Sequence, residues 1–465
     1  MNRIRTMLTL TAAAVLAGTS GCTAVDRAGG TADEPVRTLS FAQANDGEPP
    51  PQLRAWADEV ERASDGTLSI EFADGWRRGE AGAERGILAD VAEGEADLGW
   101  VGARAFDRVG VTSFQALLAP MLVDSHALQR AVFEEGITEQ MLTGVDDAGV
   151  VGIGVLPGPM RKVLGLEKPF RQPADFRGAV VGMQDSALTQ AAMEAQGATT
   201  TAEPAGATLD GLDAYEQQLA SIAGNGYVAQ ARYVTGNLNL WPRPLVLIAN
   251  PDTFDDLGDR QREALRRASR DAVLPALEAS SAEDGEGADE LCVQGMQLVE
   301  ASDDELGALR EAWEPLYGDL AADPDTARWL DRIEELKKSL GAEPDTATCT
   351  GSDDQPSDDL TGVWTTELTA ADWAAADLEG PAGTWTLEFA DGRVTGMQPD
   401  GLVGYRARYS AFRGRLVTSE ADDILNAAYR VEGDQLYLTD VTVPGANDGG
   451  PYVVVWATHP YTRAD

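Results

Sequence analysis

The chain has 465 residues, with 77 Asp and Glu against 36 Lys and Arg, and a formal net charge of −41 at pH 7. Such an acidic surface opposes binding to nucleic acid and to anionic lipid head groups, because both require clustered Lys and Arg. We therefore expect no nucleic-acid partner. A single hydrophobic core rarely extends over a chain of this length, so two or three domains are expected.

Residues 1–21 have the features of a secretory signal peptide. Two arginines precede an apolar stretch from Met7 to Leu16, and small residues follow up to Cys22. The apolar stretch is too short to span a bilayer as a mature helix. A cysteine directly after small residues is similar to the lipobox of exported lipoproteins, so we expect lipid on Cys22 and an extracytoplasmic protein anchored to the cell membrane. An ordinary cleavage site beside an unmodified cysteine is the alternative.

The other two cysteines form an even pair if Cys22 carries lipid. Export to an oxidising compartment then favours a disulfide between Cys292 and Cys349. Two unpaired buried thiols are the alternative.

Composition divides the mature chain into two folded units. Residues 22–37 are rich in Thr, Ala, Asp and Gly, which predicts a flexible tether. Residues 341–359 contain six acidic residues, no basic ones and two prolines, which predicts an acidic linker. A large unit at 38–340 and a small one at 360–465 follow.

The large unit mixes short strand-like runs with amphipathic segments, which is typical of an α/β chain. Strands are expected at 38–41, 67–72, 96–101, 150–155, 179–183, 226–228 and 245–249. Helices are expected at 52–64, 86–93, 261–277, 289–301, 304–316 and 325–340.

The small unit changes to a period of two residues. Trp385, Leu387 and Phe389 alternate with polar neighbours ahead of a hairpin turn at Asp391–Gly392, which predicts a small antiparallel β-barrel or sandwich. Gly-Val-Trp and Gly-Thr-Trp motifs ahead of the hairpins are similar to those of lipocalin-like β domains. Such a barrel holds an apolar ligand or is filled by its own side chains. Further strands are expected at 415–417, 428–431, 435–438 and 452–456.

Signatures of enzymes are scarce. The only histidines are His126 and His459, and the chain has no G-x-S-x-G, H-E-x-x-H or G-x-x-x-x-G-K motif. Carboxylate pairs carry little weight in a chain with 77 acids. We expect no enzyme, no catalytic residues, no metal and no cofactor.

Several short motifs occur in a family-specific order. Ala63-Ser64-Asp65-Gly66 precedes a strand, Ala92-Glu93-Gly94-Glu95-Ala96-Asp97-Leu98 follows, and Gln172-Pro173-Ala174-Asp175-Phe176-Arg177-Gly178 lies before a further strand. With these motifs the chain resembles the extracytoplasmic solute receptors of TRAP (tripartite ATP-independent periplasmic) transporters.

The resemblance implies a two-lobed α/β receptor, like a periplasmic binding protein, followed here by the small β-barrel. It also implies one small polar organic ligand between the lobes, which the receptor delivers to membrane permease subunits. A surface sensor or adhesion lipoprotein that retains the receptor fold without transport is the alternative.

The resemblance also implies site residues. Arg161 matches the family's first cleft arginine, whose guanidinium holds a carboxylate through two parallel hydrogen bonds. Gly182 stands where the family has a second arginine, so the ligand is less acidic, or Arg104 or Gln184 compensates. For Arg161 a structural or solvated arginine is the alternative, for Asp213 and Asn225 buried structural hydrogen bonding, and for the tryptophans core packing. The other candidates are Asp213, Asn225, Asn237, Trp241, Trp76 and Trp100.

Overall fold

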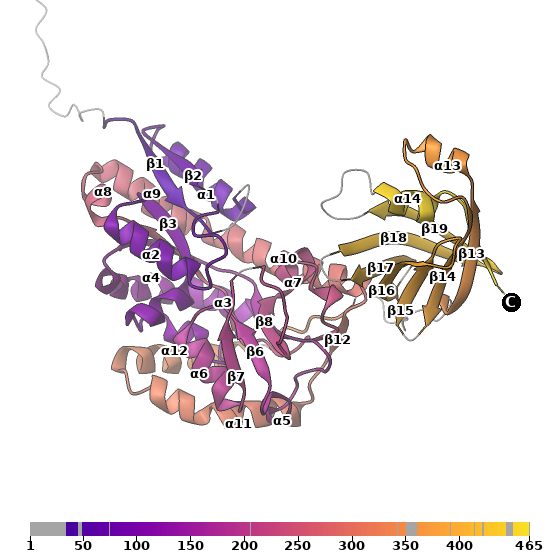
Figure 1. Cartoon of the computed structure of the whole chain (residues 1–465). Helices are drawn as coiled ribbons and strands as arrows, with labels where there is room; N and C mark the ends of the chain where they lie inside the picture. The colour runs from indigo at the N-terminus through magenta and orange to yellow at the C-terminus, as the bar shows by residue number, and fades with distance from the viewer. Residues whose placement is uncertain are drawn as a thin grey trace, which may run out of the picture. The chain divides into compact units, whose positions relative to one another are not determined.

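The computed structural model describes residues 34–464, except for 45–48, 74, 205, 342, 350–359, 391, 413, 421–422 and 443–449. Cys22 and the predicted signal peptide lie outside the described residues. Figure 1 traces an α/β portion, coloured indigo to salmon, and a β-rich portion, coloured orange to yellow. Two mixed α/β sheets followed by an antiparallel barrel confirm the predicted fold class.

The first lobe is built on a five-stranded sheet in the order β2-β1-β3-β11-β4. β1 runs parallel to β2 and β3, whereas β11 lies antiparallel between β3 and β4. Chain segments that are far apart in the sequence therefore form one lobe. The strands are β1 Arg37–Ala42, β2 Leu68–Ala73, β3 Leu98–Gly102, β4 Val151–Leu156 and β11 Leu245–Ala249.

Helices cover both faces of this sheet. On one side Leu53, Trp56 and Val60 are fully buried against the sheet residue Phe41, because helical spacing places all three on one face of the first helix. The helices of the lobe are α1 Pro51–Ala63, α2 Ala83–Glu93, η1 Ala103–Val109, η2 Gln115–Leu118, α3 His126–Glu134, α4 Ile137–Met141, η3 Leu142–Ala148, α8 Pro251–Asp255 and α9 Asp259–Asp271.

The second lobe is built on a seven-stranded sheet in the order β12-β9-β5-β8-β6-β7, with β10 paired to β5 outside this path. Its strands are β5 Met160–Gly165, β6 Val180–Met183, β7 Thr199–Ala202, β8 Ala214–Gln218, β9 Tyr233–Thr235, β10 Trp241–Pro242 and β12 Gln297–Val299. Its helices are α5 Pro173–Phe176, α6 Ala187–Ala195, α7 Leu219–Gly224 and η4 Tyr227–Ala229.

Two short crossovers join the lobes, at 157–159 and 243–244. They lie against each other, because Arg243 N donates to Pro159 O at 3.0 Å. A Cβ atom on Gly158 would stand only 2.0 Å from the carbonyl oxygen of Arg243, so the close approach of the two crossovers requires glycine.

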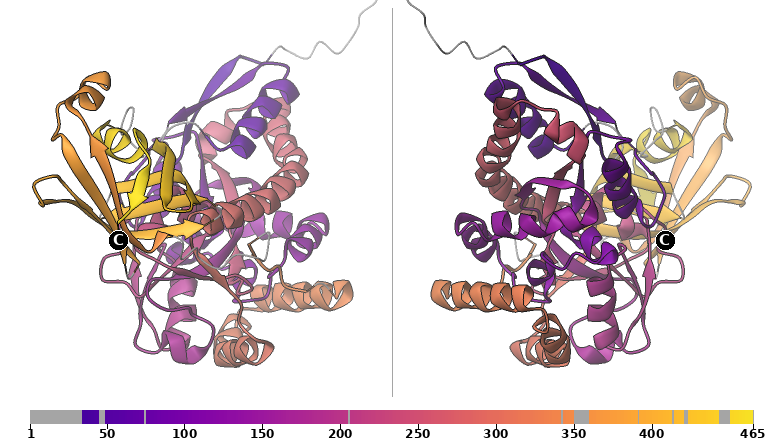
Figure 2. Two further views of the ribbon diagram at one scale, coloured as in Figure 1. Left: turned by 90° about the vertical axis from the view of Figure 1, so that its right-hand side faces the viewer. Right: turned by 90° about the vertical axis from the view of Figure 1, so that its left-hand side faces the viewer.

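Three long helices complete the receptor. α10 Val273–Val293 packs on α7 of the second lobe and on α9 and β4 of the first, so it connects both lobes. α11 Asp303–Leu320 packs on α6, and α12 Pro324–Leu340 packs on α3. In both views of Figure 2 the salmon helices α11 and α12 lie together at the lower end of the receptor.

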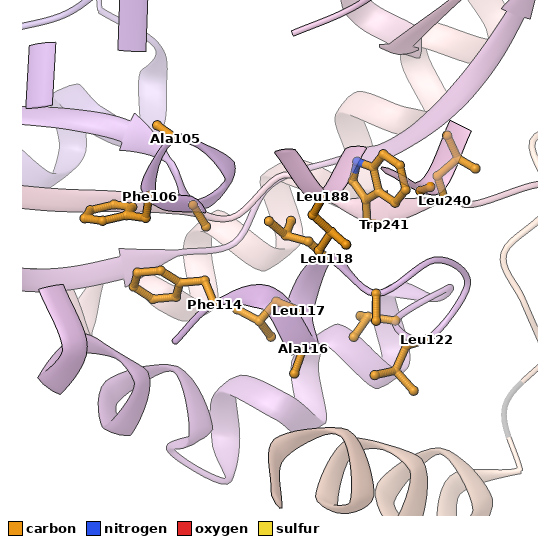
Figure 3. Packing of buried hydrophobic residues seen from close by; sticks show 14 of the residues in the cluster. Ala105, Phe106, Phe114, Ala116, Leu117, Leu118, Leu122, Leu188, Leu240 and Trp241 are labelled. Carbon is orange, nitrogen blue, oxygen red and sulfur yellow. The ribbon is translucent and has the colours of Figure 1, made fainter. Parts of the chain in front are cut away.

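One apolar cluster runs through both lobes. It includes Val91 of α2 and Val101 of β3 from the first lobe, and Val163 of β5 and Val181 of β6 from the second. Figure 3 shows Trp241 with Leu118, Leu188 and Leu240 within this cluster. The lobes are therefore packed against each other here.

The segment after α12 is tied back to the receptor. Ala347 N donates to Gly236 O at 3.1 Å, and Asp345 N donates to Asp124 O at 3.1 Å. Cys292 of α10 and Cys349 form a disulfide with a Cα–Cα distance of 5.7 Å. The receptor's contacts therefore extend to residue 349, into the segment that composition assigned to the linker.

The C-terminal portion is a closed barrel of antiparallel strands β13 to β20. Trp364, Phe389 and Leu436 are fully buried in one cluster with Trp456 of the helix between the last two strands. The barrel's elements are β13 Gly362–Leu368, α13 Ala370–Ala375, β14 Gly383–Ala390, β15 Arg393–Met397, β16 Val403–Phe412, β17 Arg415–Glu420, β18 Asp423–Glu432, β19 Gln435–Thr442, α14 Gly450–Ala457 and β20 Tyr461–Arg463.

Some expected elements are wrong. The expected strand at 452–456 lies within helix α14. The expected strand at 226–228 overlaps η4, whose N-cap residue Gly226 has a φ of +65°. The expected helix at 261–277 is divided between α9 and α10 at Ala272. The expected helix at 289–301 ends at Val293, and the chain turns into β12, which pairs with β9.

Candidate functional site

Arg161 lies at the interface of the lobes, paired with a carboxylate of its own chain. The side chains of Arg161 and Glu216 are each 1% exposed, and Arg161 Nε also donates to Glu216 Oε1. Arg161 Nη2 donates to Glu216 Oε2 at 2.8 Å and to Glu216 O at 2.9 Å. Trp241 Nε1 donates to Glu216 Oε1 at 3.1 Å. Glu216 thus accepts bonds from two of the predicted site residues.

A second set of charges comes from the first lobe. Arg104 of η1 has its Nη2 atom 2.6 Å from Oε2 of Glu84, which lies in α2. Arg243 of the second crossover donates from Nη2 to Glu84 Oε1 at 3.3 Å. We call Glu84, Arg104, Arg161, Glu216 and Arg243 the interlobe charge cluster.

The groups of this cluster influence each other's pKa values. Burial lowers the pKa of Arg161, but Glu216 outweighs this effect and raises the pKa. Burial lowers the pKa of Arg104 to about 10, and Glu84 opposes the change only in part. For Glu84, burial acts to raise the pKa, but Arg104, Arg243, the backbone hydrogen bond of Gly102 and Arg161 together lower it. Arg104 and Arg161 therefore differ: the acidic partner of Arg161 offsets burial, whereas that of Arg104 does not.

Several buried polar atoms at this interface have no hydrogen-bond partner among the described residues. They are Arg104 Nε, Arg243 Nε, the Tyr215 hydroxyl, Gln184 Oε1 and Gln218 Oε1. Gln184 directly follows β6, and Gln218 ends β8. Because parallel strands β6 and β8 end at the same sheet edge, both amides belong to that edge. Unsatisfied buried donors and acceptors are the atoms that a polar ligand would pair with.

Gly182 has no space for the arginine that the family resemblance places there. A Cβ atom at this position would stand 2.6 Å from Leu212 Cδ1 and 2.8 Å from Tyr215 Cδ2. Tyr215 is fully buried. The second lobe therefore supplies no second carboxylate clamp at residue 182.

The structure brings Arg104, Arg161 and Trp241 together, with Gln184 at the same interface, and places the other candidates elsewhere. Asn237 exchanges two hydrogen bonds with the backbone of Ala301, from Nδ2 at 2.7 Å and to Oδ1 at 2.8 Å. Asp213 is exposed, and its Oδ2 accepts from Val180 N at 2.8 Å. These two side chains are used to hold backbone segments.

The remaining candidates have three different structural roles. Asn225 is exposed at the end of α7 and donates to Ser221 O at 2.7 Å. Trp76 Nε1 donates to Asp90 Oδ2 at 2.7 Å. Trp100 is buried in the apolar core of the first lobe.

Sequence reasoning missed Glu84, Tyr215, Glu216 and Arg243. A charged residue inside a buried strand, as Glu216 is in β8, was the available signal, but β8 itself was not expected. Arg243 stands between Pro242 and Pro244 at the second crossover, a pattern that by itself indicates only a turn.

Four surface cavities of about 440 to 740 Å³ are described on the receptor, and Arg104, Arg161 and Tyr215 line none of them. Their side chains are 5%, 1% and 0% exposed. In this conformation these three side chains are closed off from solvent.

A family profile described as bacterial extracellular solute-binding protein, family 7 (DctP) matches residues 51–323, which is more than half of the chain. The chain belongs to this family. The match confirms the predicted kinship with TRAP-type solute receptors, and the protein is a receptor of this type.

Solved structures agree on the fold. A TRAP periplasmic solute-binding protein from Ochrobactrum anthropi is 21% identical with a TM-score of 0.57, over 66% of this chain and 97% of that chain. One from Xanthobacter autotrophicus with bound β-D-galacturonate is 20% identical with a TM-score of 0.58, over 64% and 99%. A sugar-acid binding protein from Advenella mimigardefordensis in complex with galactonate is 17% identical with a TM-score of 0.58, over 66% and 99%.

Among the described residues, no helix combines the length and apolar character needed to cross a membrane. Within that same part of the chain, no group of three or more His, Cys, Asp and Glu side chains is arranged to hold a metal ion.

Proposed function

We propose that this receptor binds one small organic carboxylate between its lobes, with Arg104 and Arg243 receiving the carboxylate group. The observation that carries the proposal is the buried Arg104 guanidinium, whose pKa burial lowers to about 10 and whose Nε has no hydrogen-bond partner among the described residues. A ligand carboxylate would supply the missing negative charge and accept that bond.

The rest of the site suits a hydroxylated ligand. The amide oxygens of Gln184 and Gln218 accept hydrogen bonds and have none, and the Tyr215 hydroxyl also lacks a partner within the described residues. Ligand hydroxyl groups can donate to the first two and accept from the third. The galacturonate and galactonate bound to two of the relatives each combine one carboxylate with several hydroxyl groups. Sugar acids are therefore the first compounds to test.

In this proposal the ligand carboxylate does not bind at Arg161 and residue 182, where the family resemblance places it. Glu216 already neutralises Arg161 from within the chain, and Gly182 offers no cation, so the second lobe presents no free positive charge among these residues. The first lobe and the crossover supply it instead.

Titration calorimetry of the mature chain with D-galacturonate, D-glucuronate and D-galactonate tests the proposal, with neutral D-galactose for comparison. We expect micromolar affinity for one acid, equivalent to about −8 kcal/mol, and a matching rise in melting temperature. Arg104→Gln weakens that binding by about 100-fold, because a charged hydrogen bond contributes roughly 1.5–3 kcal/mol.

Arg267→Gln is the matched control, since Arg267 is an exposed arginine of α9 with a side chain 58% exposed. Its affinity should equal that of the wild type. Equal affinities of wild type and Arg104→Gln for the acid that binds would contradict the placement of the carboxylate.

We also propose that the protein works at the outer face of the membrane, anchored by lipid on Cys22, and hands its solute to permease subunits without catalysis of its own. Support comes from the lipobox-like N-terminus and from the family's role in solute binding. Mass spectrometry of the membrane fraction should find a diacylglyceryl group on Cys22, and Cys22→Ser should release the chain into the medium.

A further inference from the structure

Asp107 of η1, in the first lobe, binds the N-terminus of α6 in the second lobe. Its Oδ1 accepts from Ala187 N at 3.0 Å, and its Oδ2 accepts from Leu188 N at 2.9 Å and from the Ser186 hydroxyl at 2.7 Å. The first N–H groups of a helix have no partner within the helix, and the helix dipole favours a negative charge beside them. Asp107 satisfies two of these groups from the opposite lobe.

This contact is additional to the cap that α6 provides for itself. Ser186 Oγ accepts from Thr189 N at 3.1 Å, so the helix has its own N-cap residue. The bonds to Asp107 therefore serve the pairing of the lobes as well as the helix, because they exist only when the lobes are in contact.

The neighbouring residue makes a second charged contact between the same two elements. Arg108 Nε donates to Asp185 Oδ1 at 2.9 Å, and Arg108 Nη2 donates to Gln190 Oε1 at 2.8 Å. Arg85 of α2 lies on the other carboxylate oxygen, with its Nη1 3.0 Å from Asp185 Oδ2. Each lobe thus presents an acid to a positive group of the other.

These bonds are distinct from the interlobe charge cluster. Among the described residues, the side chains of Asp107, Arg108 and Asp185 bond to one another's lobes without bonding to a member of that cluster. Gln184, which follows β6, directly precedes Asp185, so the Asp185 contact lies next in the chain to one of the site amides.

We propose that Asp107 and Arg108 form an interlobe latch, meaning their bonds to residues 185–188 and 190, which holds the receptor closed and sets how long a solute is retained. The latch positions the lobes and does not touch the solute. Loss of the latch would leave the solute-binding residues unchanged. It would lower the fraction of receptors that are closed, and with it the apparent affinity for the solute.

Electron–electron distance measurement between spin labels tests the latch without any solute. Labels at Asp58→Cys on α1 and Thr199→Cys on β7 report the separation of the lobes, in a Cys22→Ser background with the native disulfide intact. Both positions are exposed and lie outside the latch. We expect a short-distance population in the otherwise unchanged chain that falls at least threefold in Asp107→Asn and in Arg108→Gln.

Asp147→Asn is the matched control, because Asp147 is an exposed acid of η3 in the same lobe. It should keep the short distance. Circular dichroism must show the native signal in each variant, and two separate latch variants allow for one that folds poorly. Unchanged distances in both variants, or only long distances in the unchanged chain, would refute the latch.

Calorimetry with D-galacturonate separates this inference from the proposed site. Latch variants should bind the acid at least threefold more weakly and release it faster, whereas Arg104→Gln should weaken binding with the labels' distances unchanged. Failure of all acids to bind would count against the carboxylate site and leave the distance result standing.

Discussion

Arg161 of β5 and Glu216 of β8 are diagonal neighbours on one face of the second sheet, since Glu216 stands opposite Val163 and Arg161 stands opposite Gln218. Two hydrogen bonds from Arg161 Nη2, at 2.8 and 2.9 Å, reach Glu216 Oε2 and Glu216 O. Both side chains are almost fully buried, so each depends on the other for neutralisation.

Removing one partner should therefore cost more than removing both. Glu216→Leu leaves a buried guanidinium unpaired, and we expect it to lower the free energy of unfolding by about 3–5 kcal/mol. The double variant Arg161→Leu with Glu216→Leu should recover part of that loss. Urea unfolding measures both. A single variant as stable as the wild type would show that Arg161 finds another counter-charge.

The crossover glycine gives a second prediction. Gly158→Ala places a methyl group 2.0 Å from the carbonyl oxygen of Arg243, a backbone atom, so one crossover must move. We expect a loss of at least about 2 kcal/mol of unfolding free energy, as in overpacked sites. Gly285→Ala is the control, because that exposed helical glycine has no atom near its Cβ position and should gain roughly 0.5–1 kcal/mol.

The buried Lys162 should make the free energy of unfolding rise with pH above about 8. Its Nζ donates to Gly236 O at 2.7 Å and to Asn239 Oδ1, and burial lowers its pKa to about 8 although Asp284 and Asp345 act in the other direction. An unfolded chain holds this proton up to a pKa of about 10.4. Between those values the unfolded state binds more protons, so the free energy of unfolding rises with pH.

Urea unfolding between pH 7.5 and 9.5 measures this rise. Lys162→Met should abolish it, whereas Lys338→Met, at a side chain 77% exposed, should leave it unchanged. A rise of equal size in the Lys162 variant would assign it to another group.

The disulfide should contribute strongly to stability. Cys292 and Cys349 are 57 residues apart, and closing a loop of that length in the unfolded chain corresponds to about 4 kcal/mol. Replacing both cysteines by serine should lower the free energy of unfolding by a comparable amount. Thermal unfolding of the oxidised and the double-serine chains, both at pH 7, gives the comparison. Equal melting temperatures would contradict the prediction.

The sequence predicted elements whose pattern is local. Residues 245–249 form β11 as expected, because a short run of Leu, Val, Ile and Ala between turn residues suits a strand buried on both faces. The apolar run at 452–456 has the same local character but forms α14, since Val454 and Trp456 pack into the barrel core from a helix. Periodicity over so few residues does not distinguish the two.

The site was predictable only in part for a related reason. The family resemblance pointed to Arg161, and the glycine at 182 suggested either a less acidic ligand or compensation by Arg104 or Gln184. Glu216 lies 55 residues further on and meets Arg161 only through the pairing of β5 with β8, which the local pattern does not contain. Asn237 and Asp213 bind backbone atoms for the same tertiary reason.

The bond between Cys292 and Cys349 also has a mechanical consequence. Force exerted on the C-terminal domain travels along the chain to Cys349 and there divides, because one covalent route enters the middle of the receptor at α10. That helix packs on elements of both lobes. Force on the barrel would thus load α10 before it could detach α12 from the rest of the receptor.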